Sequence, residues 1–553
     1  IMVYQRFPTY KQVLVNSMKI NQNHEKFKIL IIRNFRLEKI FDAYLNYFLS
    51  FSFLNAEVTY EQFNEIHDNT VKFNNYDYII LWVRIDDILN NVRINEDQKL
   101  GHIQNIVDNM EKISHDYDCN IIIVKFDPLC YSATSNSDIL DLNSLYHRIY
   151  EMMRFTKESK NIYLIDTNII FARHGLKQLI NNSSLQRWDM PYSNFGFCEF
   201  ANLVASYIVA HKNKTKKCLV LDCDNVLWGE VAEEVGINNI ILSDIALGAK
   251  FQQFQKNVYD IFSRGIILAI CSKNNLSTVE NVFETHPSMI LKKSDFSVII
   301  ANWDDKVANL KNIAKNLNIS LSSMVFIDDQ DFEVQWVESQ LPEVTVIQFT
   351  VDEPENTIPL LQTTSLFSSL CITKEDAERN KIYQFKAIEE KLVQEAGSYD
   401  KYIKTLNIES NIKEATMFDI DRLAQLIQRT NQFNINRIRY YKEELINFIQ
   451  SDDFSVQIVT YKDKFFDYGI VGGIILKEEN TELRIISFFL SCKVLKRNLE
   501  YEMLDFCKNI LQKKQYKSLS AHHVVFEENQ LAVDFFNKAG FVEKSNDIYY
   551  FAR

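Results

Sequence analysis

Asp222 and Asp224 lie one residue apart at the end of an apolar run, in the stretch KCLVLDCDN. Three later apolar runs, in GIILAICSKNN, FSVIIANWDDK and SSMVFIDDQD, also end in polar residues. Those residues are Ser272, Lys273, Asp304, Asp305, Lys306, Asp328 and Asp329. Carboxylates, a hydroxyl and an ammonium are the groups that a phosphoryl-transfer site needs, because such a site binds a cation and the oxygens of a phosphoryl group.

The elements that must position these residues are strands of one sheet. Apolar runs of this length, separated by helical patterns, predict parallel strands with crossover helices. In an open α/β sheet, ligands bind outside the carboxyl ends of the strands, so we expect the polar residues to meet in one crevice. Carboxylates gathered there repel one another unless a cation holds them, and Mg²⁺ prefers oxygen ligands. We therefore predict a Mg²⁺ site with the ligands Asp222, Asp224, Asp328 and Asp329.

Each predicted catalytic residue has a role that its chemistry permits. Asp222 comes first after its strand and is the predicted nucleophile, because a carboxylate can form an aspartyl-phosphate intermediate. Asp224, on the same side by the strand period of two, is expected to protonate the leaving group and then activate water. Ser272 is expected to donate a hydrogen bond to the phosphoryl oxygens. Lys306 opens the amphipathic stretch KVANLKNIAKNLNI, so we expect its ammonium at a helix N-terminus, aimed at an anion.

The four runs resemble the motifs of the haloacid dehalogenase (HAD) superfamily of phosphoryl-transfer enzymes. The matching residues, in order, are Asp222, Asp224, Ser272, Lys306, Asp328 and Asp329. The wider sequence is similar to the FkbH-like branch, HAD subfamily IIIC, over nearly the whole chain. The similarity is seen in the stretches LDCDNVLWGEVAEEVG, LAICSKNN, ANWDDK and FIDD. The resemblance implies a Mg²⁺-dependent glyceryl-loading enzyme of polyketide biosynthesis. Such an enzyme takes 1,3-bisphosphoglycerate, removes phosphate and delivers the acyl unit to the phosphopantetheine thiol of an acyl carrier protein.

Several positions depart from the pattern of that family. Cys223 stands where the family usually has leucine, Val226 where it has threonine, and Glu230 where it has glycine. Gln330 and Asp331 replace an asparagine-proline pair at the metal end of the site, a change that is expected to affect substrate or rate. Strand alternation predicts that Cys223 points away from the two aspartates and packs in the place of the leucine.

Cys271, directly before Ser272, has two interpretations. A thiolate beside the bound phosphate could take the glyceryl group as a thioester, a catalytic role that rests largely on the family resemblance. Alternatively, Cys271 is a buried strand cysteine, which is the common fate of a free cysteine.

The first third of the chain is similar to the SGNH-hydrolase-like domain that precedes the HAD domain in longer members of the family. Its strand candidates are FKILIIRNF, YDYIILWVRIDDIL, NIIIVKFDP and NIYLIDTN. The place of the hydrolase serine reads Arg33-Asn34-Phe35, and the late aspartate-histidine motif reads Asp189 followed by Tyr192. Without serine and histidine no nucleophile-base pair can form, so we expect an inactive structural or carrier-docking domain.

The last third resembles a GNAT acyltransferase fold. GNAT proteins bind the coenzyme A pyrophosphate on backbone N–H groups of a glycine-bearing turn before a helix. Here the turn is SCKVLKRNLEYEM, where Lys496 replaces a glycine and Lys493 and Arg497 keep the turn positive. An active acetyltransferase, a carrier-recognition module and a structural module all remain open interpretations.

The fold class is therefore predicted as α/β, in three domains of SGNH-hydrolase-like (flavodoxin-like), HAD-like and GNAT-like type. The predicted boundaries are 1–211, 212–372 and 401–553, with a charged connecting helix at 373–400. The lysine-rich segment HKNKTKK at the first boundary is interpreted as a solvated linker or, alternatively, a docking patch for an acidic partner.

Composition limits the classes of partner. The formal net charge of −12 argues against a nucleic-acid binder, which needs a basic surface. No apolar run approaches the roughly 18 residues of a membrane span, and no signal-peptide core is recognised, so no membrane partner is expected. Nine scattered cysteines without a CxxC pair favour a reducing, cytoplasmic location. Two alternatives to glyceryl transfer stay open: a stand-alone small-molecule phosphatase and a carrier-binding pseudoenzyme scaffold.

Overall fold

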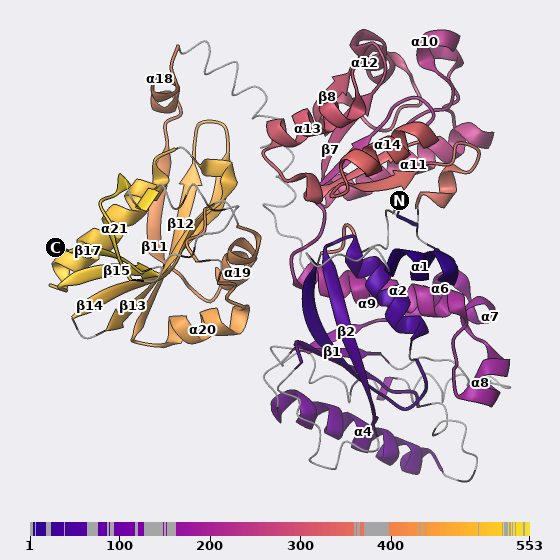
Figure 1. The fold of residues 1–553 in the computed structure, drawn as a ribbon, viewed down its shortest axis with the longest axis horizontal. Coiled ribbons are helices and arrows are strands. Elements are labelled where there is room, and N and C mark those ends of the chain that lie inside the picture. The colour runs from indigo at the N-terminus through magenta and orange to yellow at the C-terminus, as the bar shows by residue number, and fades with distance from the viewer. Residues whose placement is uncertain are drawn as a thin grey trace. The chain divides into compact units, whose positions relative to one another are not determined.

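The computed structural model describes residues 162–358 without a gap, and shorter ranges on either side (Figure 1). The other described residues are 4–5, 7–17, 24–37, 39–63, 76–85, 88, 93, 95–116, 120–125, 147–148, 151, 361, 365–369, 397–430, 433–436, 438–479, 481–495, 497–522, 524, 529, 532, 535–536, 538–545 and 548–552. Most of the predicted connecting helix at 373–400, and Lys496, lie outside the described residues.

The first sheet is parallel and buried, as its continuous apolar runs predict. Its order is β2-β1-β3-β4-β5, and all four neighbouring pairs are parallel. The strands are β1 (Glu25–Arg33), β2 (Leu54–Gln62), β3 (Tyr78–Trp82), β4 (Asn120–Val124) and β5 (Ile162–Ile165). Parallel strands covered on both faces need apolar side chains on both faces, which explains why β3 is buried at every position.

Helices cover this sheet on two sides. Leu30 and Ile32 of β1 pack with Ile103 and Val107 of α4, while α2 and α9 lie on the other side of the sheet in Figure 1. The helices of this region are α1 (Tyr10–Ser17), α2 (Ile40–Ser50), α4 (Glu96–Asp116), α6 (Asn168–His174), α7 (Leu176–Leu179), α8 (Asn182–Trp188) and α9 (Asn194–His211). The prediction of an α/β domain with crossover helices is confirmed here.

The second sheet has the order β10-β9-β6-β7-β8. The pairs β6–β7, β6–β9 and β7–β8 are parallel. The predicted site residues therefore lie at the ends of neighbouring strands. The strands are β6 (Cys218–Leu221), β7 (Ile267–Ser272), β8 (Phe296–Ala301), β9 (Met324–Asp328) and β10 (Thr345–Gln348). All four apolar runs that the sequence marked as strands are strands.

Helices and short turns connect these strands. They are α10 (Ala232–Val235), η4 (Ile237–Asn239), α11 (Ala246–Ser263), α12 (Leu276–Thr285), η5 (Lys293–Asp295), α13 (Lys306–Leu317), η6 (Leu321–Ser323), α14 (Asp331–Gln340) and η7 (Pro354–Asn356). The apolar period predicted that a helix begins at Lys306, and α13 does begin there. Val307, Leu310 and Ile313 form its buried side.

The third sheet is mostly antiparallel, with the order β11-β12-β13-β14-β15-β17-β16. Only β14 and β15 are described as a parallel pair. The strands are β11 (Glu409–Glu414), β12 (Phe454–Lys462), β13 (Asp467–Glu479), β14 (Glu482–Leu490), β15 (Ser518–His522), β16 (Val542–Ser545) and β17 (Ile548–Ala552). The helices are α18 (Tyr399–Lys404), α19 (Ile420–Arg429), α20 (Lys442–Gln450), η8 (Cys492–Val494) and α21 (Leu499–Lys513).

The lysine-rich segment after α9 is not a solvated linker, and this prediction is wrong. Lys212 and Lys214 both form ion pairs with Glu25 of β1, at 2.9 Å and 3.5 Å. Lys216 is buried, and its backbone N–H donates to the carbonyl of Leu366. These lysines are therefore held by packing and by ion pairs to Glu25, a residue far away in the sequence.

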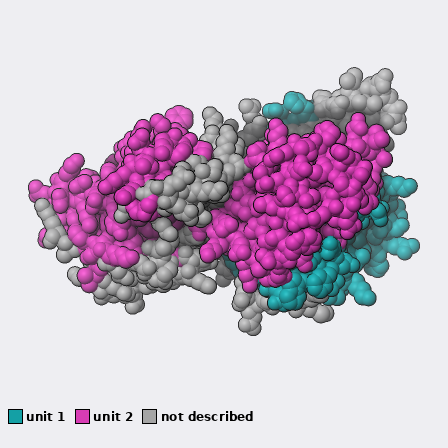
Figure 2. All heavy atoms as spheres, turned by 90° about the horizontal axis from the view of Figure 1, so that it is seen from above, with its two compact units in different colours: residues 1–216, 330–370 teal, residues 217–329, 371–553 magenta. Residues whose placement is uncertain are grey.

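The chain divides into two compact units, coloured separately in Figure 2. One contains Ile1–Lys216 and Gln330–Leu370, and the other contains Lys217–Asp329 and Cys371–Arg553. Within the described ranges, no helix has the length and apolarity needed to cross a membrane.

Candidate active site

The candidate site lies at the carboxyl ends of β6, β7 and β9, in the unit that contains Lys217–Asp329. Asp222 directly follows β6, and its backbone N–H donates to the carbonyl of Ile327 in β9, at 3.1 Å. Ser272 and Asp328 are the last residues of β7 and β9. Because these strands are parallel neighbours, residues from distant parts of the sequence end at one edge of the sheet.

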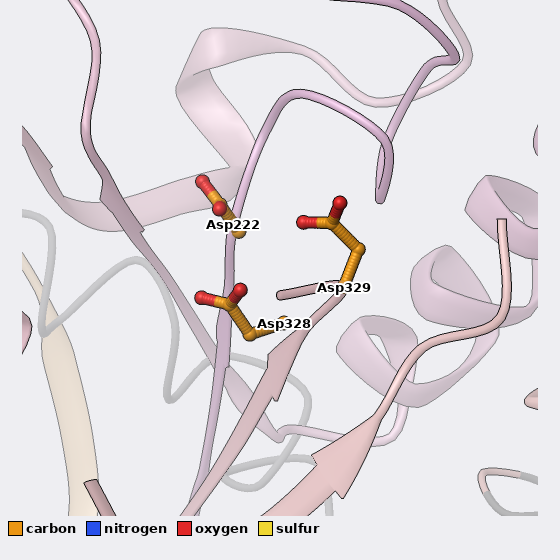
Figure 3. Close-up of side chains that lie close together, drawn as sticks. All are labelled: Asp222, Asp328 and Asp329. Atoms are coloured by element: carbon orange, nitrogen blue, oxygen red, sulfur yellow. The ribbon is translucent and has the colours of Figure 1, made fainter. Parts of the chain in front are cut away.

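Three carboxylates gather at this edge. Asp222, Asp328 and Asp329 each offer an oxygen, and these atoms all lie within 4.8 Å of one another. Figure 3 shows the three side chains close together where the two strands end. Lys306 Nζ lies 2.6 Å from Asp222 Oδ2 and 2.5 Å from Asp328 Oδ2. The ammonium therefore bridges two of the three carboxylates.

Burial makes the charges of this cluster interact strongly. Lys306 is only 1% exposed, Asp328 0% and Asp222 5%. Burial alone lowers the pKa of Lys306, but the carboxylates of Asp222 and Asp328 outweigh it and hold that pKa well above its usual range. Lys306 therefore stays charged and balances its two partners.

Asp329 is the third carboxylate of the group. Burial, followed by repulsion from Asp222, raises the pKa of Asp329 to about 6. A cation beside the three carboxylates would reverse this effect, because positive charge favours the ionised form. An all-oxygen donor set of this kind fits Mg²⁺. The residues that would hold the ion are Asp222, Asp328 and Asp329.

The carboxylate of Asp224 is held elsewhere, although the sequence predicted it as a metal ligand. Its Oδ1 accepts hydrogen bonds from Trp228 Nε1 (2.8 Å) and from the Ala232 N–H (3.1 Å), and its Oδ2 accepts from Asn274 Nδ2 (2.8 Å). The structure does not include this carboxylate in the group of three. Burial is the largest influence on Asp224 and raises its pKa, which suits a group that gives a proton to a leaving group.

Cys223 does not point away from the site, contrary to the strand-alternation prediction. β6 ends at Leu221, so the period of two no longer applies two residues later. The Cys223 thiol lies near the side chain of Ser272, the predicted phosphate-binding hydroxyl. Burial, Asp222 and Asp224 raise the pKa of Cys223 well above its usual range. The thiol is therefore protonated, and it is a poor nucleophile beside two carboxylates.

Cys271 is also enclosed. Its side chain is 0% exposed, and its Sγ lies 4.0 Å from the backbone carbonyl of Lys306. Ser272, the next residue, is 1% exposed and contacts Cys223 instead. The two neighbours at the end of β7 thus have different surroundings, and the position of Cys271 is that of a packed strand residue.

Two side-chain amides that the sequence analysis did not single out also take part. Asn274 donates a hydrogen bond to Asp224, and the side chain of Asn225 lies near the carboxylate of Asp329. Each asparagine lies within three residues of a predicted catalytic residue, in CSKNN and in DCDNV. That closeness was the only available signal, since asparagine is also common in the loops that follow strands.

The hydrolase-like positions of the first sheet serve packing. Asn34, where a serine nucleophile was sought, exchanges two hydrogen bonds with the backbone of Arg84, at 2.7 Å and 2.8 Å. Tyr192, where a histidine was sought, is buried and packs its ring against Trp82 and Phe200, with centroids 5.6 Å and 4.5 Å away. Both residues stabilise the ends of the strands.

The turn before α21 in the third sheet is poorly suited to a phosphate. Arg497 is buried and donates to Tyr461 (2.6 Å) and Asp463 (2.5 Å), so its charge is directed inward. Asn498 precedes α21 in the left-handed region, at φ 65°. Glu500 and Glu502 occupy the first turn of the helix, where their charge opposes an anion.

The gap between β14 and β15 is filled by the chain itself. The two strands pair as far as Ile485 and Ala521, and β14 then continues to Leu490. Residues 433–436 lie against this free part of β14: the Ile435 N–H donates to Phe488 O, and the Leu490 N–H donates to Phe433 O. From the other side, the Val524 N–H donates to Ile435 O at 2.9 Å. An extended ligand therefore cannot add to this edge of β14 without displacing the segment.

Comparison with known proteins finds similar solved structures. No protein-family model and no curated protein matches the sequence. The N-terminal part of protein BF1531 from Bacteroides fragilis, which contains a phosphatase domain complexed with Mg, is similar to 65% of this chain over 100% of its own length. That similarity has a TM-score of 0.55 and 25% sequence identity, and it supports an enzyme of the phosphatase type.

Solved structures of acetyltransferases are also similar to a part of this chain. The PaiA N-acetyltransferase of Thermoplasma acidophilum, in complex with coenzyme A, is 18% identical over 26% of this chain and 96% of its own, with a TM-score of 0.21. A GNAT-family acetyltransferase of Staphylococcus aureus is 15% identical over 26% of this chain and 99% of its own, with a TM-score of 0.22. The α/β fold class is confirmed.

Proposed function

We propose that the chain is a Mg²⁺-dependent phosphoryl-transfer enzyme whose nucleophile is Asp222. The observation that carries the proposal is the cluster itself: three carboxylates with oxygens within 4.8 Å, and a buried lysine 2.6 Å from the first of them. The similarity to a phosphatase domain complexed with Mg supports both the reaction class and the choice of ion. When bound, Mg²⁺ supplies positive charge for the phosphoryl oxygens.

In the hydrolysis of a phosphate monoester, each of these residues has its own role. An oxygen of Asp222 attacks phosphorus, a new P–O bond forms, and the P–O bond to the substrate oxygen breaks. Asp224, whose pKa is raised mainly by burial, gives its proton to the leaving oxygen. Water then attacks the aspartyl phosphate, Asp224 takes a proton back, and inorganic phosphate leaves. Lys306 holds the Asp222 carboxylate in place through both half-reactions.

For the substrate we propose 1,3-bisphosphoglycerate, with a phosphopantetheinylated acyl carrier protein as acceptor. The phosphate ester at C3 is the bond that Asp222 can cleave. The acyl phosphate at C1 reacts differently: a thiolate attacks the carbonyl carbon, a C–S bond forms, and phosphate leaves with the C–O bond electrons. The resemblance in the four motifs supports this substrate pair and its place in polyketide biosynthesis.

A stand-alone phosphatase is the second candidate, and the position of Cys271 favours it. A thioester on this residue requires the thiol to reach a carbonyl carbon, yet Cys271 is 0% exposed. In a transferase without an enzyme thioester, the carrier thiol must attack the acyl phosphate directly. A phosphatase needs neither thiol.

Intact-protein mass spectrometry separates these candidates. The enzyme is mixed with Mg²⁺, a system that generates 1,3-bisphosphoglycerate, and a phosphopantetheinylated carrier. We expect the carrier to gain a glyceryl unit, and we expect Asp222→Asn to prevent removal of the C3 phosphate while the protein stays folded. Cys271→Ala is the matched variant for the thioester step.

Each other outcome selects a different function. Phosphate released while the carrier stays unmodified rejects the transferase and supports the phosphatase. A glyceryl adduct on the enzyme that disappears in Cys271→Ala supports the enzyme thioester. Carrier binding without any phosphate release, in the unmodified enzyme, identifies a pseudoenzyme scaffold and rejects the proposed function.

A further inference from the structure

We propose that Trp228 is a positioning residue that orients the Asp224 carboxyl group so that Oδ2 is the oxygen that gives the proton to the leaving group. The inference rests on the proposed function, in which Asp224 protonates the substrate oxygen as the P–O bond breaks. The observation that carries it is the set of three N–H groups that donate to Asp224, because they divide unequally between its two oxygens.

The acceptor positions of Asp224 Oδ1 are occupied by two of these donors. Trp228 Nε1 donates to Oδ1 at 2.8 Å, and the Ala232 backbone N–H donates to it at 3.1 Å. Each carboxylate oxygen has about two lone-pair positions, so a proton on Oδ1 would displace one donor from its acceptor. The transferable proton is therefore disfavoured on Oδ1.

Oδ2 keeps a position for the proton. Among the residues that the structure describes, Asn274 is the one that donates to Oδ2, and its Nδ2 lies 2.8 Å away. The other lone-pair position of Oδ2 can carry the proton. When the P–O bond breaks, its electrons pass to the substrate oxygen, which takes this proton.

Asn274 holds Oδ2 from the side opposite to the indole's oxygen. Its side chain is 1% exposed, and its own Oδ1 accepts from the Asn275 N–H at 2.8 Å. Because that oxygen already accepts a backbone hydrogen bond, Nδ2 is the end of the amide that faces Asp224. The carboxyl group is thus held between the loop after β6 and the loop after β7.

Trp228 is itself fixed by packing. Its side chain is 0% exposed, and its ring packs edge-on against Phe283 of α12, with centroids 6.0 Å apart and an interplanar angle of 78°. The carbonyl of Leu227, the preceding residue, accepts from Nε2 of the buried Gln255 at 2.8 Å. A side chain that is locked by packing on a fixed backbone keeps its N–H in one place, as a positioning group must.

Loss of the indole N–H should slow one step of the reaction. The nucleophile Asp222 is held by Lys306 at 2.6 Å, a contact in which Trp228 takes no part. Without Nε1, a lone-pair position of Asp224 Oδ1 opens, so the proton can occupy either oxygen and the carboxyl group can turn. Substrates whose leaving oxygen needs a proton should therefore react more slowly, and substrates with a weakly basic leaving oxygen should not.

The test compares two phosphate monoesters with the full chain and Mg²⁺, by rapid acid quench and measurement of the phosphoenzyme in the first turnover. p-Nitrophenolate leaves without a proton, whereas the alkoxide formed from 3-phosphoglycerate needs one. In Trp228→Phe we expect 3-phosphoglycerate to react roughly tenfold more slowly or worse, as a part of the effect of a general acid. p-Nitrophenyl phosphate should react at the wild-type rate.

Three further proteins separate orientation from folding. Trp188→Phe, at a tryptophan of α8 that is 60% exposed, is the matched control and should leave both rates unchanged. Replacement of Trp228 by β-(3-benzothienyl)alanine keeps the shape of the indole without the N–H, so it should slow 3-phosphoglycerate without a lower melting temperature. In an Asp224→Asn background, Trp228→Phe should slow the reaction no further, since the proton donor is already lost.

Each other outcome rejects a stated part of the account. Wild-type rates with both esters in the benzothienyl protein overturn the inference and leave the proposed function standing. Equal slowing with both esters, or an additional loss in the Asp224→Asn background, also overturns it. A wild type that reacts with p-nitrophenyl phosphate alone lacks a working proton donor, which overturns the inference as well. If the wild type forms no phosphoenzyme from either ester, the proposed function fails and the inference fails with it.

Discussion

At the scale of single residues, Lys306 is the counter-charge on which the site depends. Its ammonium contacts two buried carboxylates, and a third lies within reach of a shared cation. The sequence correctly predicted that this lysine opens a helix, since the apolar period of the following stretch begins there. The sequence could not predict the contacts, because they join residues from separate strands.

Lys306→Met tests that role. Removal of the ammonium leaves Asp222 and Asp328 buried side by side, and breaking a buried pair costs about 3–5 kcal/mol. We expect a lower melting temperature and a larger gain from added Mg²⁺ than in the wild type, because the ion replaces the lost charge. Differential scanning fluorimetry with and without Mg²⁺ measures both effects.

Lys311→Met, on the exposed side of the same helix, is the control and should change neither value. A Lys306→Met protein as stable as the wild type, with no added benefit from Mg²⁺, contradicts the assigned role.

The two cysteines near the site are predicted to be unreactive in the folded protein. Cys223 and Cys271 are both 0% exposed, and burial followed by Asp222 and Asp224 keeps the Cys223 thiol protonated. Maleimide labelling followed by peptide mass spectrometry should modify neither residue in buffer and both in denaturant. Rapid labelling of Cys271 in buffer would show that the thiol is accessible, which favours the thioester role.

At the scale of elements, the ends of adjacent strands position the site residues. The sequence predicted β6, β7, β8 and β9 because each is a continuous apolar run, and their carboxyl ends carry the polar residues. It did not predict β2, whose burial pattern is irregular and half-exposed, or β10, which has four residues. The prediction for Cys223 extended the side-chain alternation of β6 past Leu221 into a loop. The predicted direction of the Cys223 side chain was therefore wrong.

The end of α9 predicts a pH dependence of stability. His211 is buried and hydrogen-bonded through Nδ1 to Tyr78, and burial, with a smaller effect of Lys212, lowers its pKa to about 4. The unfolded chain, with a histidine pKa near 6.5, then binds more protons than the folded one between these values. The stability from neutral His211 is present above about pH 6.5 and is lost as the pH falls towards 4.

Urea unfolding at two pH values measures this effect. By about pH 5, the loss amounts to roughly 2 kcal/mol relative to pH 7. His211→Gln keeps an acceptor for Tyr78 but cannot titrate, so its stability should fall less over the same interval. Equal losses in the variant and the wild type would assign the acid sensitivity to other groups.

The third sheet predicts weak or absent coenzyme A binding. Glu500 and Glu502 oppose a phosphate at the start of α21, and residues 433–436 occupy the free part of β14. Coenzyme A should therefore leave the melting temperature of the chain unchanged. In the same assay, we expect Mg²⁺ to raise the melting temperature. A melting temperature that rises with coenzyme A concentration would instead support the acetyltransferase interpretation.

At the scale of the whole molecule, the sequence predicted the types of fold better than the details of contact. The α/β class and the parallel sheets follow from apolar runs and their spacing. Contacts group the described chain into two units, and Lys212 and Lys214, interpreted as part of a linker, are bound to Glu25. Such long-range pairs depend on the folded arrangement, so local sequence does not contain them.

The central claim is that Asp222 becomes phosphorylated in a Mg²⁺-dependent reaction, and acid-quenched mass spectrometry tests it most directly. The enzyme is mixed with Mg²⁺ and a phosphorylated three-carbon substrate, quenched within the first turnover and digested. We predict one phosphoryl group on the peptide that contains Asp222, absent without Mg²⁺ and absent in Asp222→Asn. Phosphate release without any phosphoryl group on that peptide, or undiminished release by Asp222→Asn, would contradict the account.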